Sequence, residues 1–121
     1  MSRNAPRQRQ WRLRLKDILG ALQRIRRYTA GMDRQTFVDD DLVTDAVIRN
    51  LEIVGEAAKH VPDRVARRHP EVPWEDLRIF RNFLVHDYFG VDRDVVWETV
   101  TRDLPDLEPR IRRVFQEEQG A

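Results

Sequence analysis

The sequence predicts an all-α fold, namely an up-and-down four-helix bundle with one short extra helical turn. Apolar residues recur at steps of three and four in four segments, whereas no segment alternates apolar and polar residues over a useful length. The 121 residues suit one domain with an ordinary hydrophobic core, which we expect over residues 11–117. Residues 1–10 are polar and rich in arginine, so we expect a basic, flexible tail.

The first predicted helix covers about residues 11–32. Its apolar stripe consists of Leu15, Ile18, Leu19, Leu22 and Ile25. Gly31 is a credible stop, because glycine tolerates the left-handed conformation that ends many helices. Arg24, Arg26 and Arg27 fall in the last turns, where positive charge either complements the helix dipole or is available to bind RNA.

The second predicted helix covers about residues 41–60, and the acidic residues 39–41 supply its N-cap and a negatively charged first turn. Its stripe consists of Leu42, Ala46, Val47, Leu51, Val54, Ala58 and Val61. Gly55 lies in the middle of this helix, where glycine costs about 1 kcal/mol relative to alanine. We therefore expect another helix to approach closely at Gly55.

The remainder of the chain supplies a connector and two more helices. Residues 62–73 contain three prolines, so they accommodate at most a short helical turn. The third helix is expected over residues 74–90 and ends at a glycine. The fourth is expected over about residues 92–114 with an aspartate cap, and Pro105 and Pro109 should kink or split it.

Charge is distributed unevenly along the chain although the net charge is only +1. Residues 1–34 contain ten basic and two acidic residues, whereas residues 35–121 contain 12 basic and 19 acidic residues. The positive N-terminal third suits either a polyanion such as RNA or an acidic partner. The alternative is that its first arginines form only a solvated tail.

Several classes of protein are disfavoured by what the sequence lacks. Without cysteine there is no disulfide framework, thiolate nucleophile or cysteine-based zinc site. No apolar run approaches the roughly 20 residues of a membrane span, and the N-terminus lacks the apolar segment of a signal peptide. We therefore expect a cytoplasmic protein without a bound metal or cofactor.

Other polar and aromatic residues are interpreted as structural. His60 and His69 lack a suitably spaced carboxylate partner, so we expect both at the surface. Glu52 and Glu56 are one turn apart and could bind a cation, but with Lys59 nearby an ordinary ion-pair face is favoured. Tryptophans 74 and 97 are expected to anchor the core or an interface rather than to stack on bases.

Residues 81–88 collect the side chains best suited to catalysis, with an arginine, an asparagine, a histidine and a tyrosine in eight positions. Asn82 and His86 are four residues apart on a helix, so the amide can orient the imidazole. Arg81 and His86 are five apart, which separates them by about 140° around an ideal helix. We therefore favour a site that a second copy of the chain completes across a two-fold axis.

An arginine and a histidine without a metal suit cleavage of an RNA phosphodiester. The imidazole can take the proton of the 2′-hydroxyl or protonate the leaving oxygen, while the guanidinium holds the phosphoryl oxygens. RNA carries its own nucleophile, so no metal-activated water is required. The alternative on local pattern alone is a histidine with no catalytic role near a helix end.

The pattern Arg81-x4-His86-x-Tyr88 on the third helix resembles the HEPN superfamily, and more closely its HepT-like toxin ribonucleases. Other segments also resemble family motifs and occur in the same order along the chain as in the family, at residues 46–49, 54–59, 73–74, 81–82, 88–92 and 104–107. The similarity therefore extends over roughly residues 11–115. One departure is Ile79-Phe80 before the motif arginine, where the family often has Gly-Met.

This resemblance implies a HEPN-like helical fold and a homodimer whose Arg81 and His86 residues line one cleft, with Asn82 as a polar neighbour. It implies a metal-independent endoribonuclease acting on tRNA or mRNA, the toxin of a type VII toxin–antitoxin pair. A small nucleotidyltransferase antitoxin of the MntA type would transfer AMP to Tyr88. Such a group would add negative charge and bulk next to the cleft.

A second hypothesis belongs to a different class. The chain would be a non-catalytic helical partner that binds a nucleotidyltransferase, nucleic acid or both, with its positive N-terminal third on the nucleic acid. RNA binding that depends strongly on salt, without cleavage, would distinguish it from the ribonuclease.

Overall fold

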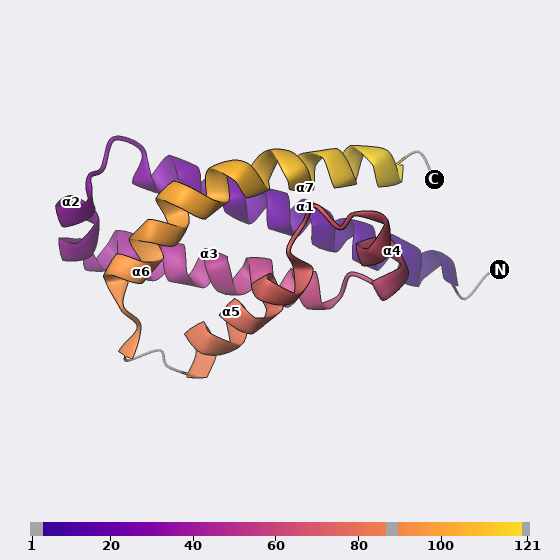
Figure 1. The fold of residues 1–121 in the computed structure, drawn as a ribbon, viewed down its shortest axis with the longest axis horizontal. Helices are drawn as coiled ribbons and strands as arrows, with labels where there is room; N and C mark the ends of the chain where they lie inside the picture. Colours follow the sequence, from indigo (N-terminus) through magenta and orange to yellow (C-terminus); the bar gives the residue numbers. More distant parts are fainter. Residues whose placement is uncertain (1–3, 87–89, 120–121) are drawn as a thin grey trace.

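The computed structural model describes residues 4–86 and 90–119 and, for residues 4–9, 85 and 86, the backbone alone. Its helices are α1 (Asn4–Thr29), α2 (Arg34–Asp39), α3 (Asp41–Lys59), α4 (Asp63–Arg68), α5 (Trp74–His86), α6 (Arg93–Glu98), the π-helical segment η2 (Thr99–Asp103) and α7 (Leu104–Gln119). No strand occurs in the described residues, and α1 packs against α3 and α7 while α5 packs against α3 (Figure 1). The predicted all-α, HEPN-like bundle is confirmed.

Helix α1 ends where the sequence predicted, but it does not begin where the sequence predicted. Gly31 has a φ of +76°, the left-handed conformation that ends the helix as predicted. At its other end α1 begins at Asn4, seven residues before the expected start, so part of the predicted tail is helical. The flexibility expected of residues 1–10 stays a prediction.

Helix α2 lies between the first two predicted helices, in a stretch for which the sequence predicted no helix. Its start is a capping box in which the Thr36 backbone N–H donates to Asp33 Oδ1 at 2.9 Å and the Asp33 N–H donates to Thr36 Oγ1 at 2.9 Å. Buried Phe37 then attaches the short helix to the core. Six residues are too few for a periodic apolar stripe, so hydrophobic periodicity did not predict this helix.

The acidic start of α3 is confirmed. The Val43 N–H donates to the Asp40 carboxylate at 2.9 Å, so Asp40 is the N-cap. Behind it, the buried Thr44 hydroxyl donates to the Phe37 carbonyl at 2.8 Å and joins α3 to α2. The cap and this bond together fix where the central helix begins.

The fourth predicted helix is divided as expected near its first proline. Five residues of π-helix separate α6 from α7, and Pro105 follows directly in the first turn of α7. Proline lacks the N–H that would continue a regular helical ladder, so a local change in the hydrogen-bond pattern at this point has a chemical cause. Pro109 lies inside α7.

The core lies between α1, α3, α5 and α7, with contributions from the short helices. Its fully buried larger side chains are Phe37, Leu15, Ile18, Ile25, Leu84, Ile111, Val47, Val65, Val72, Val96, Val114 and Thr44. Trp74 is buried and its indole N–H donates to the His69 carbonyl at 3.0 Å. Trp97 is half-buried and lies 5.1 Å from Phe37 between ring centroids, so both tryptophans are anchors as predicted.

His69 is buried, and its predicted surface position was wrong. Its Nε2 lies 2.8 Å from Oε1 of the buried Glu118, and Arg68 contacts the same carboxylate at 2.7 Å. The sequence could not show this cluster, because 49 residues separate His69 from Glu118. The cluster attaches the last turn of α7 to the end of α4. His60, by contrast, is exposed as predicted.

Helices α3 and α5 meet at Gly55, which confirms the predicted close approach. A Cβ built on Gly55 would lie 2.1 Å from the Cβ of Arg81, 2.8 Å from its Cγ and 2.8 Å from the Leu77 carbonyl oxygen. No side chain fits between these backbones. The missing Cβ therefore sets how closely α5 approaches α3 and where Arg81 begins.

We expect Gly55→Ala to destabilise the protein by about 1–3 kcal/mol, because the added methyl group must push α5 away from α3. Urea unfolding measures this change. Gly20→Ala is the matched control in α1, where the nearest atom is the end of the Arg24 side chain at 3.4 Å. There we expect a gain of up to about 1 kcal/mol from helix propensity. Equal effects at the two glycines would contradict the close-packing argument.

The Arg68–His69–Glu118 cluster generates a pH-dependent prediction. A hydrogen bond from Arg68, and then one from His69, lowers the pKa of Glu118 despite its burial. The ionised carboxylate therefore stabilises the fold above the unfolded glutamate pKa of about 4.3, and this contribution is lost as the pH falls through the lower folded value.

We expect Glu118→Gln to lower the unfolding free energy by about 1 kcal/mol at neutral pH, with the difference from the wild type shrinking as the pH falls below about 4.3. Glu117→Gln is the control, because that side chain is 56% exposed and lies 3.5 Å from His69. Urea unfolding across pH measures both, and a difference that stays constant from neutral to acidic pH would refute the linkage.

Candidate active site

Arg81 is held on α5 by contacts at both ends of its side chain. Its Cβ lies against Gly55, and its guanidinium Nη2 lies 3.1 Å from Glu56 Oε2. The Nη1 group donates to the Asn82 amide oxygen at 3.2 Å. The Arg81 side chain is 27% exposed, so the charge is accessible while its stem is covered.

Glu56 stands between two basic groups. Its Oε1 lies 3.3 Å from His60 Nε2 and its Oε2 faces Arg81. The hydrogen bond from His60 lowers the pKa of Glu56, and the positive charges of Arg81 and Lys59 act in the same direction against partial burial. Glu56 is therefore an ionised partner of Arg81 at neutral pH.

The prediction that Glu52 and Glu56 form ion pairs is supported, but their partners differ from the expected Lys59. Glu52 lies 3.4 Å from Arg49, and Glu56 is paired with Arg81 and His60 rather than directly with Lys59. Among the described residues, acidic and histidine side chains form no group of three suited to a metal ion.

A shallow pocket of about 210 Å³ opens beside Arg81 between α1, α3 and α5. Its lining residues are Arg14, Asp17, Arg49, Glu52, Ile53, Glu56, Ala57 and Arg81. The three arginines are balanced by three carboxylates, so the pocket has no excess charge to attract a phosphate. Neither Arg14 nor Arg49 was predicted to be a site residue, because only the packing of α1 on α3 brings them near Arg81.

The three arginines proposed to bind RNA lie elsewhere on α1. Arg24 donates from Nε to the Asn50 amide oxygen at 2.8 Å, a half-buried contact between α1 and α3. Arg26 lies 3.4 Å from Glu108 and is 66% exposed, and Arg27 is exposed. Ten residues separate Arg24 from Arg14, about 15 Å along a helix. Their role in RNA binding stays a prediction.

The structure describes His86 and Tyr88, the second half of the predicted motif, only in part. His86 is the last residue of α5, and its side chain lies outside the described residues, as does Tyr88 altogether. The structure thus brings Arg81 and Asn82 together. The pairing of Asn82 with His86 and the roles of His86 and Tyr88 stay predictions.

Helix α5 exposes apolar side chains around this motif. Ile79 is 56% exposed and Phe83 is 42% exposed, and the ring of Phe83 stacks on that of Phe80 at a centroid distance of 6.3 Å. In the described residues the main packing partner of α5 is α3. Exposed apolar surface of this kind is typical of a protein–protein contact.

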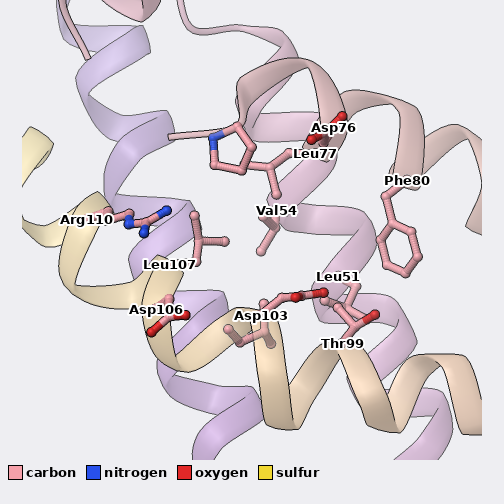
Figure 2. A pocket seen from close by; sticks show the side chains of 12 residues that line it. Leu51, Val54, Asp76, Leu77, Phe80, Thr99, Asp103, Asp106, Leu107 and Arg110 are labelled. Carbon is pink, nitrogen blue, oxygen red and sulfur yellow. The ribbon is translucent and has the colours of Figure 1, made fainter. Parts of the chain in front are cut away.

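This apolar surface continues into a second pocket of about 370 Å³ between α3, α5, η2 and α7. Figure 2 shows Leu51 and Val54 of α3 between Leu77 and Phe80 on α5 and the residues of η2 and α7. Acidic residues at its edge are Asp76, Asp103 and Asp106, and Arg110 lies at the same edge. An apolar floor with a polar edge resembles a protein interface more than a site for chemistry.

The described helices include none that is long and apolar enough to cross a membrane.

The candidate site offers the positively charged guanidinium of Arg81 on α5, a helix that packs mainly against α3. Such a group binds phosphoryl or carboxylate oxygens and stabilises negative charge that develops on them.

Sequence comparisons identify similar proteins over most of the chain. The family model described as "Ribonuclease HepT-like" matches residues 18–114. The chain is 41% identical over 100 residues to the "Probable ribonuclease HepT" of Thermococcus cleftensis, covering 83% of this chain and 91% of that protein. It is 35% identical over 105 residues to a "Putative RNase" of Caldanaerobacter subterraneus subsp. tengcongensis, covering 87% and 94%. No solved structure matches significantly.

Proposed function

Because the chain belongs to the HepT-like ribonuclease family, we propose that it is an endoribonuclease that cleaves RNA without a metal ion. The observation that carries the proposal is that the family match includes all of α5, on which Arg81 is held with its guanidinium accessible. Arg81 and His86 are the proposed catalytic residues, and Asn82 supports Arg81 through its amide oxygen.

In the proposed reaction, the 2′-hydroxyl of RNA attacks the adjacent phosphorus and the bond to the 5′-oxygen of the next nucleotide breaks. His86 takes the proton of the hydroxyl or protonates the leaving oxygen. Arg81 stabilises the negative charge that builds on the phosphoryl oxygens. The products carry a 2′,3′-cyclic phosphate and a free 5′-hydroxyl, and the substrate class is tRNA or mRNA.

The functional unit of this proposal is a homodimer in which two α5 helices line one cleft. Exposed Ile79 and Phe83 and the adjoining apolar pocket supply surface that a second copy would cover. The separation of Arg81 from His86 around an ideal helix also favours a site shared between subunits.

Control by a partner completes the proposed function. The chain would be the toxin of a type VII toxin–antitoxin pair, and an MntA-like nucleotidyltransferase would transfer AMP from ATP to Tyr88. The added phosphate places negative charge two residues from His86, where it would repel the phosphates of RNA. No cofactor is required by the chain itself.

The non-catalytic alternative is supported by the exposed Arg26 and Arg27 near the end of α1. These residues suit binding of nucleic acid or of an acidic partner without any cleavage.

We expect Arg81→Ala and His86→Ala each to reduce RNA cleavage at least about 100-fold while the helical content stays unchanged. Cleavage in EDTA, analysed for a 2′,3′-cyclic phosphate, is the measurement. Arg113→Ala serves as the control, because Arg113 is an exposed arginine on α7 and is not among the residues proposed to bind RNA. Cleavage that survives both substitutions would exclude the proposed motif, and salt-sensitive RNA binding without cleavage would favour the alternative.

Mixing the two inactive variants tests the shared site. If Arg81 of one subunit acts with His86 of the other, half of the randomly mixed dimers contain one intact site, so about a quarter of the wild-type activity should return. No recovery, in a mixture shown to exchange subunits, would place each site within one chain.

Co-expression with a cognate nucleotidyltransferase is expected to increase the intact mass by one or more AMP units and to silence RNA cleavage. Mass spectrometry of peptides should place the modification on Tyr88, and Tyr88→Phe should prevent both changes. Tyr28→Phe is the control at the other tyrosine of the chain. Modification that maps elsewhere would contradict this form of control.

A further inference from the structure

We propose that Glu56 is a positioning residue that holds the guanidinium of Arg81 in the orientation needed to bind the phosphoryl group. The inference rests on the proposed ribonuclease function and adds a residue of α3 to the site. Its basis is that consecutive residues of one helix fix both ends of the same arginine.

The stem of Arg81 is fixed by Gly55. With 2.1 Å between the Arg81 Cβ and the place of a Gly55 Cβ, the first carbon of the side chain fills the space left by the glycine. The next residue, Glu56, then meets the guanidinium at 3.1 Å. A single turn of α3 therefore determines where the side chain starts and where its charge ends.

Few other contacts restrain the guanidinium. Among the described residues, Arg81 Nε is buried without a hydrogen-bond acceptor, and Nη1 contacts only the neighbouring Asn82 at 3.2 Å. A long arginine side chain carries about 2 kcal/mol of rotamer entropy, so one missing contact lets it sample other orientations. Catalytic groups must be held within a fraction of an ångström, and a misplacement of about 1 Å can cost 100-fold in rate.

Charge, rather than a well-aligned hydrogen bond, provides the contact. Glu56 Oε2 is close to Arg81 Nη2, but no N–H points at it well enough to form a hydrogen bond. Its other oxygen is held by His60 at 3.3 Å, so the carboxylate itself is oriented. The neutral amide of glutamine has the same shape but would lose most of this attraction.

The negative charge of Glu56 also opposes RNA binding. A carboxylate next to Arg81 cancels part of the positive potential that attracts a phosphate. Removing that charge should therefore strengthen RNA binding while it loosens the arginine. A lower KM together with a lower kcat is the signature of this role, whereas simple unfolding would reduce the active fraction without tightening RNA binding.

The experiment compares Glu56→Gln and Glu56→Asp with the wild type in RNA cleavage. We expect Glu56→Gln to lower kcat about 10- to 100-fold and to lower KM, and Glu56→Asp, which keeps the charge, to recover part of kcat. Glu75→Gln is the matched control, because Glu75 also pairs with an arginine, Arg78 at 3.5 Å, but does not line the pocket beside Arg81. Circular dichroism and thermal unfolding verify that each variant is folded.

A double-mutant cycle with Arg81→Ala shows whether Glu56 acts through Arg81. In the Arg81→Ala background, Glu56→Gln should produce no further loss of residual cleavage. An unchanged kcat in Glu56→Gln, an increase in kcat, or an equal loss in both backgrounds would overturn the inference.

The same cycle measured by urea unfolding needs no enzymatic activity. The two substitutions together should shift the unfolding midpoint by less than the sum of their separate shifts, because they remove one shared contact. Strict additivity would refute the contact between Glu56 and Arg81. If the wild type cleaves no RNA, the proposed function fails, and this measurement still decides whether Glu56 holds Arg81.

Discussion

The crossing of α3 and α5 at Gly55 determines the geometry of the candidate site. Two helix backbones approach so closely there that even a methyl group has no room, and the Arg81 Cβ occupies the space that a side chain would need. Close packing of this kind does not adjust gradually, because protein interiors have little free volume. The position of Arg81 is therefore a property of the fold rather than of α5 alone.

Polar contacts between segments distant in the sequence join other helices of the bundle to one another. Arg68 and His69 hold Glu118 at the end of α7, and Arg93 lies 2.9 Å from Asp41 and donates to the Val38 carbonyl at 2.6 Å. The second set joins the start of α6 to the α2–α3 junction.

The packing of α5 is one-sided, and this asymmetry connects the fold to the proposed function. Leu84 is fully buried against the core, whereas Ile79 and Phe83 are exposed on the same helix. A helix with apolar residues on more than one face is expected to touch more than one neighbour. The proposed second subunit would provide the missing neighbour and would bring a second Arg81 to the same cleft.

The sequence by itself predicted the helices that have long periodic stripes, the stop at Gly31, an acidic N-cap at residues 39–41 and the division of the last helix near Pro105. These features depend on local backbone preferences and on hydrogen bonds between residues close in the chain. It also located Arg81 and the close approach at Gly55, because a glycine in a helix interior needs a packing reason.

Only the tertiary structure showed that the helix approaching Gly55 is α5, that the residue packed there is Arg81, and that Glu56 pairs with it. It likewise decided the burial of His69 with Glu118 and placed Arg14 and Arg49, rather than Arg24, beside Arg81. The physical reason is the same in each case. Helix periodicity defines which face is buried, but the rotation and register of one helix against another depend on side chains distant in the sequence.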